Sequence, residues 1–299
     1  MNARQVMMLG LIAVTRGSSF LFVAIALKSF GPFVITFFQF LLAALTLGAA
    51  ALFTGELGAA FSRLRQEPGP TLTFGMTQAV IPYLLVTLGQ QVIPSSLAAI
   101  LLATAPLFVV LLAWVFDQSE RMQPLQIGGL LVGLPGVALV AGGGKVTSFA
   151  QILGMGAIIL AAASNALSGL VMKRFYHTIP PITGTFLAFL TGVPLLLPFA
   201  VFSHPYVQPG VNNMLTILVI GVLNTALPLV VYIQLLREVG AGRALLMTYL
   251  SPAVALLLAA VILHEVITVW AVLGLVFILS GVMAVARQPH LPIGKVRNQ

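Results

Sequence analysis

The chain has 299 residues, of which 60% are hydrophobic and only 7% are charged, and its formal net charge is +8. A soluble domain carries about 25% charged residues, so this composition excludes a chain that could cover its whole surface with water-compatible side chains. The absence of cysteine excludes disulfide bonds and thiolate metal sites. Together these features indicate an integral membrane protein.

Apolar residues occur in blocks of about 20, the length at which a helix spans the hydrocarbon core of a bilayer. Backbone polar groups in lipid must pair within their own segment, so we expect these blocks to be α-helices. In chain order the pattern predicts ten spans, at roughly residues 6–27, 33–54, 71–92, 96–116, 124–142, 152–172, 181–202, 213–235, 244–263 and 268–286. The segments between them, including Gly55–Pro70, are expected to be connections. The first span follows Arg4 directly and is interpreted as a retained helix, not a signal peptide.

Lysine and arginine are distributed unequally between the two ends of these spans. If the N-terminus is cytoplasmic, the cytoplasmic segments hold 11 of the 14 Lys and Arg residues. The outer loops then hold only Lys28 and Lys145, and Arg16 falls within the first span. The positive-inside rule therefore predicts a multi-pass protein of the inner membrane with both termini in the cytoplasm. The same bias accounts for the net charge, so no nucleic-acid partner is expected.

The two halves of the chain resemble each other. At an offset of 146 residues, Gly75 corresponds to Gly221, Pro82 to Pro228, and Pro106 to Pro252. This repeat predicts two five-helix units, at residues 1–143 and 144–299. Because five is odd, the second unit must cross the membrane in the opposite sense. Inverted repeats are typical of secondary transporters, whose substrate site lies between the units near the midplane. The alternative is a duplication with a purely structural role.

A helix centred on proline, then a glutamate, then a glycine-rich helix ending Gly-Val-x-x-Val-Ala occurs at residues 101–141 and again at 246–286. This pattern resembles the EamA module of the drug/metabolite transporter superfamily. The string Gly17-Ser18-Ser19-Phe20 also resembles the opening motif of that family, which usually has Trp where this chain has Arg16. The ten-helix count resembles the YddG-like amino-acid exporters. The resemblance implies export of amino acids or similar metabolites through a central cavity lined mainly by helices 1, 3, 4, 6, 8 and 9.

Arg16 is the one ionised side chain that the predicted spans place near the bilayer centre. A charge there is costly, so we expect it to face a wet cavity or a partner. It could bind a substrate carboxylate with its guanidinium group, or it could bond neighbouring carbonyls and extend toward the interface. All six acidic residues fall in connections or at helix ends. This distribution favours a neutral or zwitterionic substrate, and leaves open a coupling role for Glu120, Glu265 or His264 at the membrane edges.

Uncharged polar residues within the expected cavity helices are candidates for substrate binding, because amide and hydroxyl groups can bind an ammonium or a carboxylate. They are Ser18, Ser19, Gln78, Tyr83, Thr104, Asn165, Ser168, Asn224, Tyr249 and Ser251. The alternative for each is a hydrogen bond between helices. Four mid-helix prolines, Pro82, Pro106, Pro228 and Pro252, are candidates for hinges or for static kinks. Gly129, Gly133, Gly274 and Gly281 are expected at close helix contacts.

Other classes of function find less support in the sequence. An intramembrane enzyme would need a nucleophile–base pair or metal ligands within the spans, and the sequence shows neither, so no metal or cofactor is expected. The sequence thus predicts a monomer-sized exporter of amino acids or related metabolites that works by alternating access. The alternatives are efflux of drugs or other metabolites by the same superfamily, or a pore-type channel. The expected partners are the lipid bilayer and a small-molecule substrate.

Overall fold

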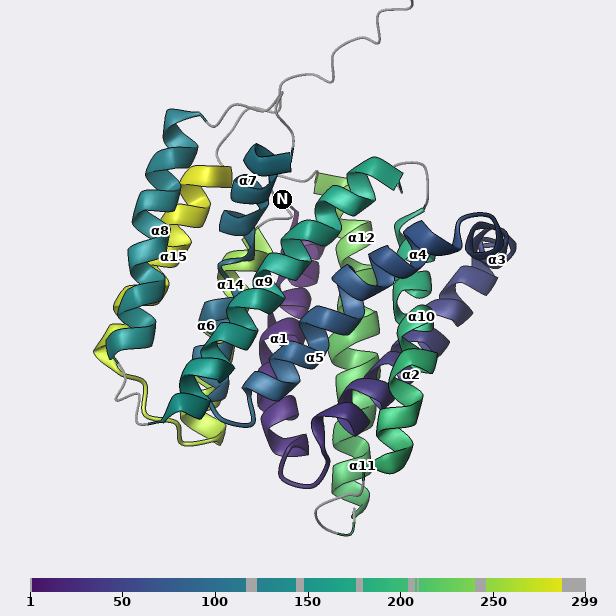
Figure 1. Ribbon diagram of the computed structural model, residues 1–299, viewed down its shortest axis with the longest axis horizontal. Coiled ribbons are helices and arrows are strands. Elements are labelled where there is room, and N and C mark those ends of the chain that lie inside the picture. Colours follow the sequence, from purple (N-terminus) through teal and green to yellow (C-terminus); the bar gives the residue numbers. More distant parts are fainter. Residues whose placement is uncertain are drawn as a thin grey trace, which may run out of the picture.

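The computed structural model describes residues 2–116, 123–143, 148–175, 180–203, 208, 210–239 and 246–286. In this part of the chain the regular structure is helical, with two π-helical segments inside longer helices (Figure 1). The elements are α1 (Ala3–Ala26), α2 (Pro32–Phe53), α3 (Leu57–Gln66), α4 (Pro68–Gly75), η1 (Met76–Val80), α5 (Ile81–Gly89), α6 (Ser95–Leu102), α7 (Ala105–Phe116), α8 (Pro124–Gly143), α9 (Phe149–Phe175), α10 (Pro181–Phe202), α11 (Val211–Leu218), η2 (Val219–Ala226), α12 (Leu227–Val239), α14 (Leu246–Ile262) and α15 (Val269–Ala286).

These elements form ten apolar spans. Eight stretches of the described chain are long and apolar enough to cross a membrane, and two shorter apolar helices, within α14 and α15, complete the set. Span 3 consists of α4, η1 and α5, span 4 of α6 and α7, and span 8 of α11, η2 and α12. The predicted all-α membrane fold with ten spans is confirmed. The observed bounds differ from the predicted ones by a few residues. At the start of α1, the Asn2 side chain accepts a hydrogen bond from the Gln5 backbone N–H and so caps the helix.

Span 4 differs from the predicted continuous helix of residues 96–116. It is interrupted at Ala103 and Thr104, just before Pro106, which is the second residue of α7. Proline has no backbone N–H to donate to the preceding turn. The Thr104 hydroxyl bonds the Leu101 carbonyl at 2.6 Å and so satisfies an acceptor near the break.

The connection predicted at Gly55–Pro70 is also corrected by the structure. It contains a helix, α3, and Pro68 already begins α4. Polar and charged residues such as Arg63 and Arg65 hide α3 from a search for long apolar blocks. Its apolar residues Leu57 and Leu64 pack against the cluster that fills the space between α2, span 3 and α10. The helix therefore forms because one of its faces has a partner on the bundle.

The two π-helical segments occupy corresponding places in the two halves. Residues 76–80 of η1 correspond to residues 222–226, which lie within η2, at the same offset of 146. Each segment is followed directly by a helix with proline in its second position, Pro82 in α5 and Pro228 in α12. A wider turn before each proline accommodates the missing donor, and π-turns of this kind are frequent at functional sites.

Glycines at corresponding positions mark corresponding helix contacts between the halves. A Cβ on Gly75 of span 3 would overlap Thr191 of α10, and a Cβ on Gly221 of span 8 would lie 2.5 Å from Leu42 Cβ of α2. The third span of each half thus packs against the second span of the other half. The two halves therefore meet along matched surfaces, as the repeat in the sequence requires.

The predicted close contacts of the glycine-rich helices are confirmed. α8 and α15 lie side by side at one edge of the bundle, away from α2 and α10 (Figure 1). A Cβ on Gly129 would lie 2.7 Å from the Gly281 carbonyl oxygen, and a Cβ on Gly136 would lie 2.8 Å from the Gly274 carbonyl oxygen. These positions bring the two backbones together by the small-residue packing that lipid-embedded helices use.

Candidate functional site

A cavity of about 350 Å³ lies inside the bundle and takes its lining from both halves of the chain. Spans 1 to 4 contribute from the first half, and spans 6, 8 and 9 contribute from the second. The lining residues are Arg16, Ser19, Phe20, Val23, Gln39, Gln78, Pro82, Tyr83, Val86, Thr87, Ala99, Leu102, Ala103, Ala105, Pro106, Asn165, Asn224, Leu229, Met247, Ser251 and Pro252. The wall is therefore mostly apolar with a few polar groups, the usual make-up of a small-molecule site.

Most of the residues selected from the sequence meet at this cavity. They are Arg16, Ser19, Gln78, Tyr83, Asn165, Asn224 and Ser251, together with Pro82, Pro106 and Pro252. Five others lie outside the lining. Ser18 and Ser168 bond the lining amides of Asn224 and Gln78. Thr104 is buried at the break in span 4, Tyr249 packs against the apolar cluster around α6, α8 and α15, and Pro228 is buried at the start of α12.

Two polar side chains of the cavity form matched hydrogen bonds between helices. The Ser168 hydroxyl of span 6 donates to Gln78 Oε1 of span 3. The Asn224 amide of span 8 donates to the Ser18 hydroxyl of span 1 at 2.8 Å, and also to the Thr15 carbonyl. Gln78 and Asn224 are equivalent in the repeat, and so are spans 6 and 1. These amides thus join the two halves at equivalent points, each within one of the π-helical segments.

A second group of lining side chains is not engaged in this way. Within the part of the chain that the structure describes, the side chains of Arg16, Ser19, Tyr83 and Asn165 make no hydrogen bond. The Tyr83 ring is held in place by edge-to-face contacts with Phe40 and Phe189, at centroid distances of 5.7 and 5.6 Å. The donors and acceptors of this group are therefore free to meet a molecule in the cavity.

Arg16 gives the cavity its electrostatic character. It is half-buried, and it is the one formally charged residue among those that line the cavity. Tyr232 of α12 lies near enough to interact electrostatically with it. A guanidinium group with no carboxylate beside it in the lining attracts anionic groups, and its planar donors match a carboxylate.

Two polar lining residues escaped the sequence analysis. Gln39 of α2 is 2% exposed, and its amide donates to the Thr225 hydroxyl at 2.8 Å. Thr87 of α5 is also buried and bonds the Tyr83 carbonyl at 2.9 Å. A mid-span glutamine was a usable signal in the sequence. Helix 2 is not among the helices that the family resemblance implies for the cavity.

Glu265 joins the second half of the chain to the first. Its Oε1 accepts hydrogen bonds from the Ser95 backbone N–H at 2.8 Å and the Ser95 hydroxyl at 2.7 Å. Its Oε2 accepts from the Ser96 backbone N–H at 3.0 Å and the Ser96 hydroxyl at 2.5 Å. The carboxylate therefore caps the N-terminus of α6, where the helix dipole also favours negative charge. Its counterpart in the repeat, Glu120, lies outside the described residues, as does Lys145.

At the opposite end of the bundle, α1 and α12 are joined by weaker polar contacts. Arg4 lies 3.5 Å from Glu238, and Gln5 also donates to this carboxylate at 3.5 Å. The Arg4 side chain is 61% exposed, so the pair is open to solvent and contributes little to stability. The polar contacts of Glu265 and of Glu238 between helices thus differ greatly in strength.

Comparison with known proteins agrees with this architecture. Residues 4–142 and 152–287 each match the model of the EamA-like transporter family. A solved crystal structure superimposes with a TM-score of 0.65 at 19% identity, covering 95% of this chain and 96% of the other, which supports the fold alone.

Among curated relatives, the chain is 29% identical to the "Probable terminal-alkyne amino-acid exporter" of Streptantibioticus cattleyicolor, over 96% of this chain and 94% of the relative. It is 24% identical to the "Uncharacterized inner membrane transporter YedA" of Escherichia coli, over 87% and 84%. The alignments with two relatives from Bacillus subtilis are shorter and cover 57% and 65% of the length of those relatives. Because the family model covers nearly the whole described chain in two copies, this protein belongs to the EamA-like transporter family, and it is a multi-pass membrane transporter.

Proposed function

We propose that the protein exports amino acids, or related small zwitterions, across the inner membrane by alternating access. In this proposal both termini are cytoplasmic, and residues 1–143 and 144–299 form the two units that move relative to each other. Pro82, Pro106, Pro228 and Pro252 would serve as the hinges. The substrate would occupy the cavity of about 350 Å³ between the units.

The observation that carries the proposal is the lining of this cavity. Arg16 supplies a guanidinium group for a carboxylate, while the Asn165 oxygen and the Ser19 hydroxyl supply acceptors for an ammonium group. Apolar neighbours such as Phe20 and Met247 offer a surface for an uncharged side chain. No aspartate or glutamate is among the lining residues, so an organic cation would find no counter-ion in the lining.

The similarity to an exporter described as acting on an amino acid supports the same class of substrate. That relative aligns over 96% of this chain, so the alignment spans both halves of the cavity.

The direct test is transport by purified protein in liposomes, with a panel of radiolabelled amino acids. We expect saturable uptake of neutral amino acids well above that of empty vesicles, because a cavity with a single central site limits the flux at high concentration. Flux that rises linearly with concentration would indicate a channel. Flux of organic cations but not of amino acids would indicate drug efflux, and flux no greater than in empty vesicles for the whole panel would refute the proposal.

A further inference from the structure

The helix α3 connects span 2 to span 3. It contains Arg63 and Arg65 and ends just before α4 begins. One of its faces is fixed to the bundle. Ala60 is fully buried, and the Phe61 ring makes an edge contact with Phe186 of α10 at a centroid distance of 6.2 Å. Phe61 is nevertheless 45% exposed, so the helix presents part of this aromatic ring outward. α3 is thus an amphipathic helix that runs along the surface of the bundle.

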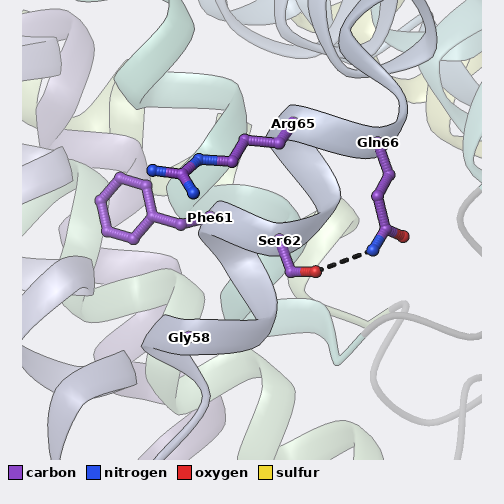
Figure 2. A pocket seen from close by; sticks show the side chains of 5 residues that line it. All are labelled: Gly58, Phe61, Ser62, Arg65 and Gln66. Carbon is purple, nitrogen blue, oxygen red and sulfur yellow. Dashed lines mark hydrogen bonds between the residues drawn. The ribbon is translucent and has the colours of Figure 1, made fainter.

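The outer face of α3 borders a surface groove of about 450 Å³ lined by Gly58, Phe61, Ser62, Arg65 and Gln66. Figure 2 shows the Arg65 guanidinium group extending past the Phe61 ring on one side of the helix. On the other side, the Gln66 amide donates to the Ser62 hydroxyl at 3.0 Å, which leaves the hydroxyl hydrogen free to donate elsewhere (Figure 2). Apart from the neighbouring backbone of α3 itself, no atom lies within 4 Å of the point where a Cβ of Gly58 would stand, so the groove is open there.

The charge of Arg65 stays uncompensated in the described part of the chain. Its neighbour Arg63 forms an ion pair with Glu67 at 2.6 Å. The Glu56 carboxylate, at the start of α3, accepts a hydrogen bond from the Thr183 hydroxyl at 2.9 Å. Both acids beside α3 therefore have partners, and no carboxylate of the described residues lies within ion-pairing distance of Arg65. The groove consequently carries a net positive charge next to an exposed aromatic ring.

We propose that this groove binds the headgroup of an anionic phospholipid in the adjoining leaflet. The guanidinium group of Arg65 and the hydroxyl of Ser62 would donate to the phosphate oxygens. An acyl chain would lie along Phe61 and along Phe53, which is 90% exposed at the end of α2. A cation at the membrane surface beside aromatic residues favours a lipid over a soluble phosphate, because each part of the lipid then finds a matching surface. This proposal does not depend on which substrate the cavity carries.

Native mass spectrometry of the full-length protein in detergent tests the proposal, with dioctanoyl phosphatidylglycerol as the probe. We expect Arg65→Gln to weaken binding of this lipid about fivefold, the usual contribution of one basic residue near a charged membrane surface. The affinity of Arg65→Lys for this lipid should lie between those of the wild type and Arg65→Gln, since lysine keeps the charge but loses the planar pair of donors. The matched control is Lys28→Gln, which removes an exposed cation before the start of α2, at the opposite end of that helix from α3, and should leave the affinity unchanged.

Two further probes complete the test. Dioctanoyl phosphatidylcholine should bind more weakly than phosphatidylglycerol, and glycerol phosphate, which lacks the acyl chains, should bind weakly or not at all. Equal binding of phosphatidylglycerol by wild type and Arg65→Gln would overturn the proposal. An equal loss in Lys28→Gln would also overturn it, because the effect would then be one of overall charge. Tight binding of glycerol phosphate would assign the groove to a soluble ligand instead.

Discussion

Replacing Arg16 with glutamine is expected to lower the transport of neutral amino acids tenfold to a hundredfold. Hydrogen bonds to a charged group contribute about 1.5–3 kcal/mol, and about 1.4 kcal/mol corresponds to a factor of ten. Arg16 is the one guanidinium group in the lining, so no other lining residue can replace it. The measurement is the initial rate of uptake into liposomes as a function of amino-acid concentration.

The control for Arg16→Gln uses a second arginine of the same helix. Arg4 lies near the start of α1, is 61% exposed and is not part of the cavity, so Arg4→Gln should transport normally. A substrate analogue without its carboxylate should be affected much less by Arg16→Gln, because it has no group for the guanidinium to bind. Equal losses for the amino acid and for this analogue would show that Arg16 acts on the fold and not on the carboxylate.

Glu265→Ala is expected to destabilise the protein by about 2–4 kcal/mol, because the carboxylate accepts four hydrogen bonds from Ser95 and Ser96 at the N-terminus of α6. The apparent melting temperature in detergent, followed by tryptophan fluorescence, should fall by roughly 5–10 °C. The melting temperature of Glu265→Gln should fall less, since the amide carbonyl oxygen can still accept two of these hydrogen bonds.

Two controls isolate the contribution of the Glu265 hydrogen bonds to stability: a second glutamate variant and a comparison of combined substitutions. Glu238→Gln removes a carboxylate whose partner Arg4 is largely exposed, and it should change stability by less than about 1 kcal/mol. In the Glu265→Ala background, replacing Ser95 and Ser96 with alanine should cost little more, because these hydroxyl groups have already lost their acceptor. Additive losses would mean that Glu265 stabilises the protein through other contacts.

The sequence was sufficient to predict the ten spans because the rule that governs them is local. A block of about 20 apolar residues has one stable structure in lipid, whatever its neighbours are. The repeat also predicted which residues would correspond, and Gly75 and Gly221 do lie at matching contacts. The helix α3 was missed because its stability depends on packing of Leu57 and Leu64 against other spans, which a local pattern does not reveal.

The candidate cavity was predictable in composition but not in detail. Polar residues near the middle of a span are costly unless they face a partner or a cavity, so Arg16 and Asn165 could be selected from the sequence alone. The sequence alone could not predict which of these residues already have hydrogen-bond partners. Such bonds join helices that are distant in sequence, as between Gln78 and Ser168. Thr104 shows the opposite case, since its hydroxyl bonds the Leu101 carbonyl of the same span, at the break between α6 and α7.

The central claim is that both halves contact one substrate in a shared cavity, and thiol labelling tests it most directly. The chain contains no cysteine, so Ser19→Cys in the first half and Ser251→Cys in the second would each carry a single reactive thiol. Both positions line the cavity. We expect a transported amino acid to slow modification of both thiols by a small maleimide, with the same half-maximal concentration at each. If the amino acid leaves the labelling rate unchanged at both positions, in protein shown to transport it, the result would contradict a binding site between the halves.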